Sequence, residues 1–278
     1  MKIIMTLLVR DEEDIIRDNI EYHLSQGVDY IIATDNKSVD STAAILKEYE
    51  NKGILKYIYE AEDNYSQHKW VTRMARMAFS EYGADWIINN DADEFWWPVE
   101  GTLRDIFIST SPEINILQAQ RYNYLLVDGN KQPFYKRMLY RELTSLNPLG
   151  KPLPPKVAHR ACATIDVAQG NHSVTGIDNP SILHDRIDIF HYPIRSYKQI
   201  VNKIEKGGAA YERNTKLNKS IGSTWRTLYS EYKENNNLQS YFDEQFNDTK
   251  TVHEKLASNL VVEDRRLCDY IETQIKNK

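Results

Sequence analysis

Two aspartates that flank one small residue carry the strongest chemical signal in this sequence. Asp91 and Asp93 follow the apolar run 86–88, at the expected end of a buried strand. Carboxylate oxygens are hard ligands that suit Mg²⁺ or Mn²⁺, and these ions keep positions open for water and for substrate phosphate. A pair this short also arises by chance as two solvated loop carboxylates, so its meaning depends on the elements that position it.

Strands and helices alternate along the first 98 residues and place this pair. The continuous apolar run 3–9 is typical of a strand buried on both faces. Repeated strand–helix alternation predicts an α/β fold with a doubly wound, mostly parallel sheet. Ligands of such sheets bind outside the carboxyl ends of the strands, where Asp91 and Asp93 fall. The predicted strands are 3–9, 30–33, 55–59 and 85–89, and the predicted helices begin at Asp11 and span 41–52 and 68–82.

The pattern is less regular after Pro98. Residues 147–155 hold four prolines and predict a loop. Residues 217–278 are polar and helix-prone, and contain no motif that indicates chemistry. Further strands are predicted at 115–120, 132–139, 161–167 and 187–191, and a helix is predicted from Ser196.

Several charged residues are predicted to lie at the same ligand edge. Asp35 ends the second predicted strand, where its carboxylate can accept hydrogen bonds from a base or a ribose. Lys69 and Arg73 lie one helical turn apart and can face one anion together, although a solvated basic helix face explains them equally well. Further cations that could serve this edge are Arg10, Arg195 and Lys203.

Two histidines extend the candidate site. His191 ends a predicted apolar strand, where a neutral imidazole can complete a metal shell with two carboxylates, or fill a purely structural role. His172 lies in a turn that begins with Gly170, and it can act as a general base. Asp166 and Asp188 are the other candidate bases, and the sequence gives no order among the three.

Absent motifs and composition exclude several classes of protein. No Gly-x-Gly-x-x-Gly follows the first strand and no Walker-type loop occurs, which disfavours dehydrogenases and P-loop enzymes. The net charge of −5 disfavours a nucleic-acid partner. Two cysteines far apart in the sequence argue against a disulfide scaffold, and no apolar stretch approaches the roughly 20 residues of a membrane span. We therefore predict a cytoplasmic protein, with peripheral association at the inner face of the membrane left open.

Taken together, these segments resemble the family-2-like glycosyltransferases of the GT-A fold, and in particular their bacterial family-2 glycosyltransferase-like branch. The resemblance covers residues 1–210, and its sequence motifs are 8–12, 34–42, 85–95, 170–172 and 191–196. It implies a Rossmann-like glycosyltransferase domain at 1–210, with a nucleotide-binding half at 1–98 and an acceptor half at 99–210. A helical C-terminal extension is expected at 211–278.

The resemblance also implies a nucleotide-diphosphate-sugar donor and a divalent ion, Mn²⁺ or Mg²⁺. It implies Asp35 near the base or ribose and Arg73 near the diphosphate. It further implies Asp91 and Asp93 on the metal, and His191 is similar to the histidine that completes the metal shell in many members. The candidate nucleotide-sugar-binding residues are Arg10, Asp35, Lys69, Arg73, Asp91, Arg195 and Lys203.

The sequence departs from the family-2-like pattern in two respects. Asn36 stands where the family's loop has glycine, and neither a Glu-Asp pair nor a Gln-x-x-Arg-Trp motif is found. Processive synthesis is therefore disfavoured and the catalytic base stays undecided.

We predict a metal-dependent, inverting transfer of a sugar to a hydroxyl of a glycan or glycolipid acceptor, in surface polysaccharide synthesis. The sequence does not exclude a retaining reaction, which needs no such base. It is also compatible with a sugar nucleotidyltransferase, and with a non-catalytic carbohydrate-binding or scaffold protein on the same fold.

Overall fold

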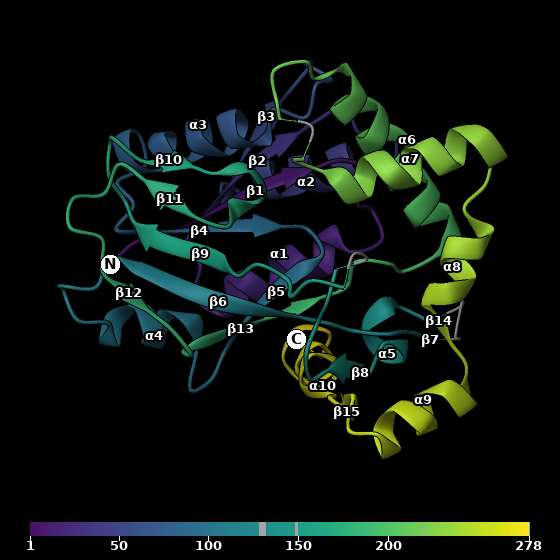
Figure 1. The fold of residues 1–278 in the computed structure, drawn as a ribbon. Helices are drawn as coiled ribbons and strands as arrows, with labels where there is room; N and C mark the ends of the chain where they lie inside the picture. Colours follow the sequence, from purple (N-terminus) through teal and green to yellow (C-terminus); the bar gives the residue numbers. More distant parts are fainter. Residues whose placement is uncertain (128–131, 148–149, 219, 278) are drawn as a thin grey trace. The chain divides into compact units, whose positions relative to one another are not determined.

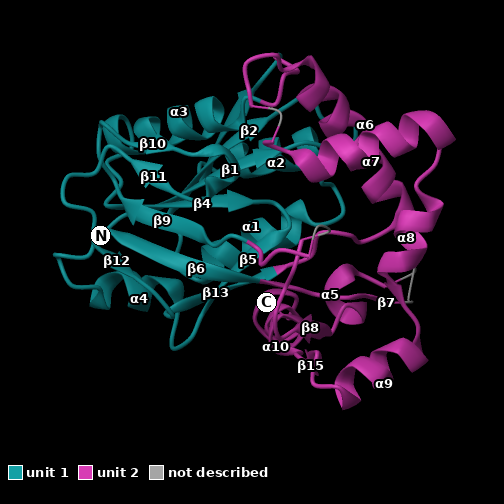
Figure 2. Cartoon of the chain, viewed as in Figure 1, with its two compact units in different colours: residues 1–61, 66–121, 154–190 teal, residues 62–65, 122–153, 191–278 magenta. Residues whose placement is uncertain are grey.

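The structure is a computed structural model that describes residues 1–127, 132–147, 150–218 and 220–277. Its chain forms two compact units, shown in different colours in Figure 2. Unit 1 holds residues 1–61, 66–121 and 154–190, and unit 2 holds residues 62–65, 122–153 and 191–278. The sequence-based division at residue 210 stays a prediction.

Four parallel strands form one half of the main sheet, in the order β3-β2-β1-β4 (Figure 1). Six of the seven side chains of β1 are buried, because helices cover both faces of a strand that is apolar except for Thr6. This arrangement confirms the predicted α/β class and its parallel half. The strands are β1 (Ile3–Val9), β2 (Tyr30–Asp35), β3 (Leu55–Tyr59) and β4 (Trp86–Asp91), and the helices between them are α1 (Ile16–Ser25), α2 (Thr42–Asn51) and α3 (Gln67–Ser80).

The other half of the sheet mixes strand directions. Strand β9 pairs antiparallel with β4 on one side and with β6 on the other, and the order continues through β13 to β5. A short strand, β12, pairs parallel with β6, and β10 and β11 form a separate antiparallel pair. The bounds are β5 (Glu94–Pro98), α4 (Leu103–Ser109), β6 (Ile116–Asn123), β9 (Lys156–Arg160), β10 (Asp166–Val167), η1 (Gln169–Asn171), β11 (Val174–Thr175), β12 (Ile182–Leu183) and β13 (Ile187–His191).

Two of the strand predictions are wrong. Residues 132–139 contain the short helix α5 (Phe134–Arg137), which begins after Pro133, whose φ of −55° suits a helix start. Within 161–167 only β10 is a strand, and the longer strand is β9, which begins at Lys156. Strand β9 forms there because both of its edges find partners, and such pairing outweighs local β-propensity.

Unit 2 contains two helices that pack closely through glycine, α6 (Tyr197–Arg213) and α7 (Ser223–Asn235). A Cβ atom added at Gly207 would lie 2.5 Å from a ring carbon of Trp225, and one at Gly208 would overlap Tyr229. Close approach of these helices therefore requires glycine at both positions.

The C-terminal portion is mainly helical, as predicted, with two short strands that pair with earlier segments. Strand β14 pairs with β7 and β15 pairs with β8. No helix within the described ranges is long and apolar enough to span a membrane. The bounds are β7 (Leu126–Val127), β8 (Tyr140–Glu142), α8 (Gln239–Gln245), β14 (Phe246–Asn247), α9 (Thr249–Ala257), β15 (Val261–Glu263), α10 (Arg266–Tyr270) and a final helical turn, Ile271–Ile275.

A buried asparagine of α1 fixes the segment that carries the aspartate pair. Asn19 is fully buried, and its Nδ2 donates to the backbone carbonyls of Ala92 (3.0 Å) and Glu94 (2.8 Å). Its Oδ1 accepts from Nδ2 of Asn90 at 3.1 Å. One side chain thus satisfies two buried carbonyls and one buried amide, which holds the turn between β4 and β5.

We expect Asn19→Ala to lower the free energy of unfolding by about 2–3 kcal/mol, because it leaves these buried groups without partners. Denaturant unfolding measures the change. The matched control is Asn51→Ala at the exposed end of α2, where we expect a change within about 0.5 kcal/mol. Equal losses in both variants would contradict the anchoring role of Asn19.

Candidate active site

Asp35 ends β2 in a fixed orientation. Its carboxylate is buried, and it accepts from the backbone N–H of Ser38 and from the hydroxyl of Tyr57, both at 2.9 Å. Burial raises the pKa of Tyr57, and the hydrogen bond to Asp35 acts in the same direction, so the phenol stays protonated and donates. An ionised carboxylate has about four acceptor positions, so Asp35 can still accept from a ligand hydroxyl.

Asp91, the last residue of β4, contacts side chains of three other elements. Its Oδ2 forms an ion pair with Nζ of Lys156, a side chain of β9 that is 1% exposed. Its Oδ1 accepts from Nδ2 of Asn171 at 3.1 Å and from Nε2 of Gln67 at 3.3 Å. Gln67 also accepts from the backbone N–H of Gly170 at 3.0 Å. The charge of Asp91 is therefore balanced by a lysine of the chain.

Glu94 is buried beside the same lysine. Its Oε1 lies 3.2 Å from Nζ of Lys156 and 3.4 Å from Nη1 of Arg121. Burial raises the pKa of Glu94 to about 7; Lys156 opposes this rise, and the charge of Asp91 adds to it. Its other oxygen, Oε2, is buried and has no hydrogen-bond partner within the part of the chain that the structure describes. A buried carboxylate oxygen without a partner is costly, so this atom is a candidate ligand for a cation.

Asp93, Glu94 and His191 form the one acidic and imidazole group found among the described residues that could hold a metal ion. Each offers one ligand atom, and the three atoms lie within 4.8 Å of one another. His191, the last residue of β13, lies 2.7 Å through Nδ1 from Oδ1 of Asn123. Since an amide oxygen only accepts, Nδ1 donates this hydrogen bond, and in the neutral ring Nε2 is the nitrogen that can bind a metal.

These atoms fit a divalent ion. Two carboxylates and one neutral imidazole suit Mn²⁺ or Mg²⁺, and the unpartnered oxygen of Glu94 supplies the ligand that such a shell would use. The predicted metal ligands Asp93 and His191 fall in this group. The structure adds Glu94, whereas the predicted ligand Asp91 is paired with Lys156.

The three candidate bases have different surroundings. Nδ1 of His172 lies 2.9 Å from the carbonyl oxygen of Pro155 and donates to it, which leaves Nε2 as an acceptor. Burial lowers the pKa of His172 to about 4, and nearby Lys156 acts in the same direction, so the ring is neutral at pH 7. Asp166 is exposed on β10, where it accepts from Oγ1 of Thr72 at 3.3 Å. Asp188 is half-buried within β13.

The predicted cations lie on different elements. Arg73 of α3 pairs with Glu60 at 3.1 Å, just after β3, and Lys69 is exposed on the same helix. Arg10 directly follows β1. In unit 2, Arg195 is buried and donates to the carbonyl of Tyr192 at 3.0 Å. The ammonium of Lys203 lies 5.8 Å from the ring centre of Trp225. Their roles toward a nucleotide stay predictions.

Comparison with known protein families decides the class of this protein. The model of glycosyltransferase family 92 matches residues 5–256, which is most of the chain. The chain belongs to glycosyltransferase family 92. The predicted enzyme class, a glycosyltransferase, is thereby confirmed, and the predicted family-2-like branch is not. No curated protein matches the sequence.

The solved structures that are similar to this glycosyltransferase share little sequence with it. S. aureus TarS 1–349 in complex with UDP-GlcNAc has a TM-score of 0.45 and 14% identity, over 83% of this chain and 72% of that one. The longer S. aureus TarS has a TM-score of 0.42 and 16% identity, over 83% of this chain and 43% of that one. Glucosyl-3-phosphoglycerate synthase from Mycobacterium tuberculosis, in complex with Mn²⁺, UDP-glucose and glycerol 3-phosphate, has a TM-score of 0.32 and 16% identity, over 44% of each chain.

Sequence reasoning missed the buried cations of this glycosyltransferase. Lys156 follows a proline-rich segment and Arg121 lies within β6, and neither belongs to a motif. Glu94 stands next to the aspartate pair, and its position in that acidic run is the one signal that could have indicated a ligand.

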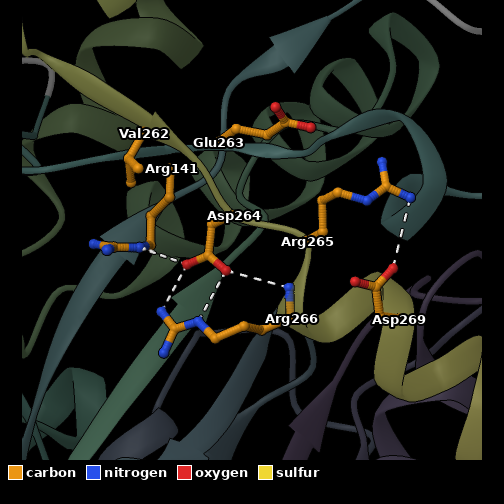
Figure 3. Close-up of a pocket in the computed structure, with 7 residues that line it drawn as sticks. All are labelled: Arg141, Val262, Glu263, Asp264, Arg265, Arg266 and Asp269. Carbon is orange, nitrogen blue, oxygen red and sulfur yellow. Dashed lines mark hydrogen bonds and ion pairs between the residues drawn. The ribbon is translucent and has the colours of Figure 1, made fainter.

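The glycosyltransferase also has a cavity in unit 2, of about 370 Å³, whose charged side chains mostly pair with one another (Figure 3). Asp264 lies at its centre, 2.9 Å from Nε of Arg141 and 2.7 Å from Nη2 of Arg266. Burial opposes ionisation of Asp264, but the hydrogen bonds from Arg266 and Arg141 more than offset it and lower its pKa to about 2. The cavity lining is Arg141, Val262, Glu263, Asp264, Arg265, Arg266 and Asp269.

We expect Lys156→Met to lower the free energy of unfolding by about 3–5 kcal/mol, because it leaves Asp91 and Glu94 without their shared cation. Adding Glu94→Gln should restore part of the loss. The control is Lys136→Met, which removes the half-exposed pair with Glu272 and should cost at most about 1 kcal/mol. Thermal and denaturant unfolding measure all three, and a small loss in Lys156→Met would contradict the buried pairing.

We expect Asp264→Asn to destabilise unit 2 in a pH-dependent way. The pKa is about 2 in the folded chain and about 3.9 in an unfolded one, so the ionised group adds about 2 kcal/mol above pH ~4. This contribution is lost as the pH falls through 2, so wild type and variant should converge there. Unfolding at pH 7, 4 and 2.5 tests this, with Glu263→Gln, exposed in the same cavity, as control. A loss independent of pH would contradict it.

Proposed function

We propose that this glycosyltransferase takes a nucleotide-diphosphate sugar as donor and transfers the sugar, with inversion, to a hydroxyl of a glycan or glycolipid, as in surface polysaccharide synthesis. A divalent ion, Mn²⁺ or Mg²⁺, would be held by Asp93, Glu94 and His191. The observation that supports this most is the buried Oε2 of Glu94 within that ligand group, which has no hydrogen-bond partner among the residues that the structure describes. When bound, such an ion neutralises the departing diphosphate.

The residues around the ion would bind and orient the donor. Asp91, held by Lys156, Asn171 and Gln67, presents a fixed carboxylate at the end of β4. Asp35 does the same at the end of β2, where a ribose hydroxyl could donate to it. Both lie outside the carboxyl ends of parallel strands, where α/β sheets bind nucleotides.

His172 is the favoured base among the three candidates. Its Nδ1–H donates to Pro155, which fixes the ring and aims the lone pair of Nε2 away from that contact. Burial lowers the pKa of His172, and the charges of Lys156 and Arg121 act in the same direction, so the ring is neutral and can accept a proton from an acceptor hydroxyl. A bound diphosphate would add negative charge near these cations and raise the pKa of His172, which would make it a stronger base.

We expect Asp93→Ala to reduce the affinity for Mn²⁺ and the Mn²⁺-dependent release of nucleotide from the donor, each by at least about tenfold. Asp91→Ala should reduce nucleotide release while retaining more of the Mn²⁺ affinity, because Lys156 rather than the ion is its cation. Paramagnetic resonance of Mn²⁺ and a hydrolysis screen across nucleotide sugars measure the two effects. The control is Asp85→Ala, an exposed residue before β4.

Wild-type Mn²⁺ affinity in Asp93→Ala would contradict the proposed metal group. Near wild-type nucleotide release in both Asp91→Ala and Asp93→Ala would contradict the role of the whole motif.

A further inference from the structure

A cationic groove runs along the outer face of α3 in unit 1. Its volume is about 380 Å³, and one wall is the exposed side of the helix while Asp166 of β10 lies opposite. Strand β10 packs beside α3, as Figure 1 shows. The lining is His68, Lys69, Thr72, Arg73, Arg76 and Asp166.

The walls of this groove are held in place by contacts that leave its charges available. Val71, Met74 and Ala78 of α3 pack into the core, so the groove residues necessarily lie on the other side of the helix. Oγ1 of Thr72 accepts from the backbone N–H of Val167 at 2.9 Å, and Nε of Arg76 donates to the carbonyl of Ile165 at 2.8 Å. The helix and the strand are thereby joined along the length of the groove.

The groove carries more positive than negative charge. Lys69, Arg73 and Arg76 lie within two turns of one helix, and like charges at such spacings repel. Arg73 forms an ion pair with Glu60, whereas Arg76 donates a hydrogen bond to a neutral carbonyl, that of Ile165. Asp166 is the one carboxylate of the lining. A bound anion would relieve this repulsion.

The length of the groove distinguishes two sources of such an anion. Gln67, which contacts Asp91, begins α3, and Arg76 stands nine residues later, about 13–14 Å along the helix axis. A donor diphosphate beside Asp91 and Asp93 would meet the near end, at Lys69. The far end, at Arg76, extends beyond it and suits a second, longer ligand.

We propose that this groove binds anionic groups, phosphate, sulfate or carboxylate, carried by the acceptor glycan or glycolipid. The inference rests on the proposed function, since it assigns an acceptor class to the same enzyme. The acceptor would then carry negative charge, a property that neither the sequence motifs nor the family specifies.

The test uses dextran sulfate as an anionic glycan probe and uncharged dextran as its neutral counterpart, both without divalent metal. Calorimetry should show binding of dextran sulfate but not of uncharged dextran, and added salt should weaken the binding of dextran sulfate. Arg76→Glu should weaken it at least about fivefold. The control is Arg17→Glu, which reverses the charge of a half-exposed arginine of α1, outside the groove, and it should bind as wild type does.

Unchanged binding of dextran sulfate by Arg76→Glu would overturn the proposal. A parallel titration with UDP, GDP and dTDP plus Mn²⁺ separates the two sources of anion. An equal loss of nucleotide affinity in Arg76→Glu would assign the groove to the donor diphosphate and also overturn it. If wild type binds none of these nucleotides but still binds dextran sulfate through Arg76, the proposed donor fails and the anion groove stands.

Discussion

The active-site edge of this glycosyltransferase depends on one buried lysine. Nζ of Lys156 lies between the carboxylates of Asp91 and Glu94, and its side chain is 1% exposed. Without it the half-buried carboxylate of Asp91 and the buried carboxylate of Glu94 would lose their shared cation, and burial would penalise the charge of Glu94 in particular. The lysine comes from β9, the antiparallel strand between β4 and β6, so the mixed half of the sheet supplies the cation that the parallel half requires.

Because of this ion pair, the acidic residues of the run 91–94 have different partners. Asp91 points to lysine and to two amides, which makes it rigid and leaves it less suited to a metal. Asp93 and Glu94 belong instead to the candidate metal group that also includes His191, and one oxygen of Glu94 has no hydrogen-bond partner within the described ranges. Asn19 holds the backbone of the same run. The acidic motif thus contains one residue held by the protein, Asp91, and two residues that we propose as metal ligands, Asp93 and Glu94.

The sequence predicts the parallel half of the fold well because its signals are local. Apolar runs such as 3–9 and the amphipathic helix from 68 follow periods that neighbouring residues reveal. Strand β9 and Lys156 give no such signal, since β9 forms through pairing with segments distant in sequence. Asp93 and His191 could be proposed as metal ligands from motifs. The ion pair of Asp91 with Lys156, in contrast, depends on the pairing of β9 with β4 and β6. For the same reason none of the predicted strands covers Glu94, which lies in β5.

We propose that a metal and a nucleoside diphosphate bind together at the carboxyl edge of the parallel strands. The most direct measurement is calorimetric titration of the wild-type enzyme with nucleoside diphosphates, in the presence of Mn²⁺ and again with EDTA. We expect at least one nucleotide to bind with Mn²⁺ and to lose affinity by about tenfold or more with EDTA. Equal affinity in both conditions, or binding in neither, would contradict it.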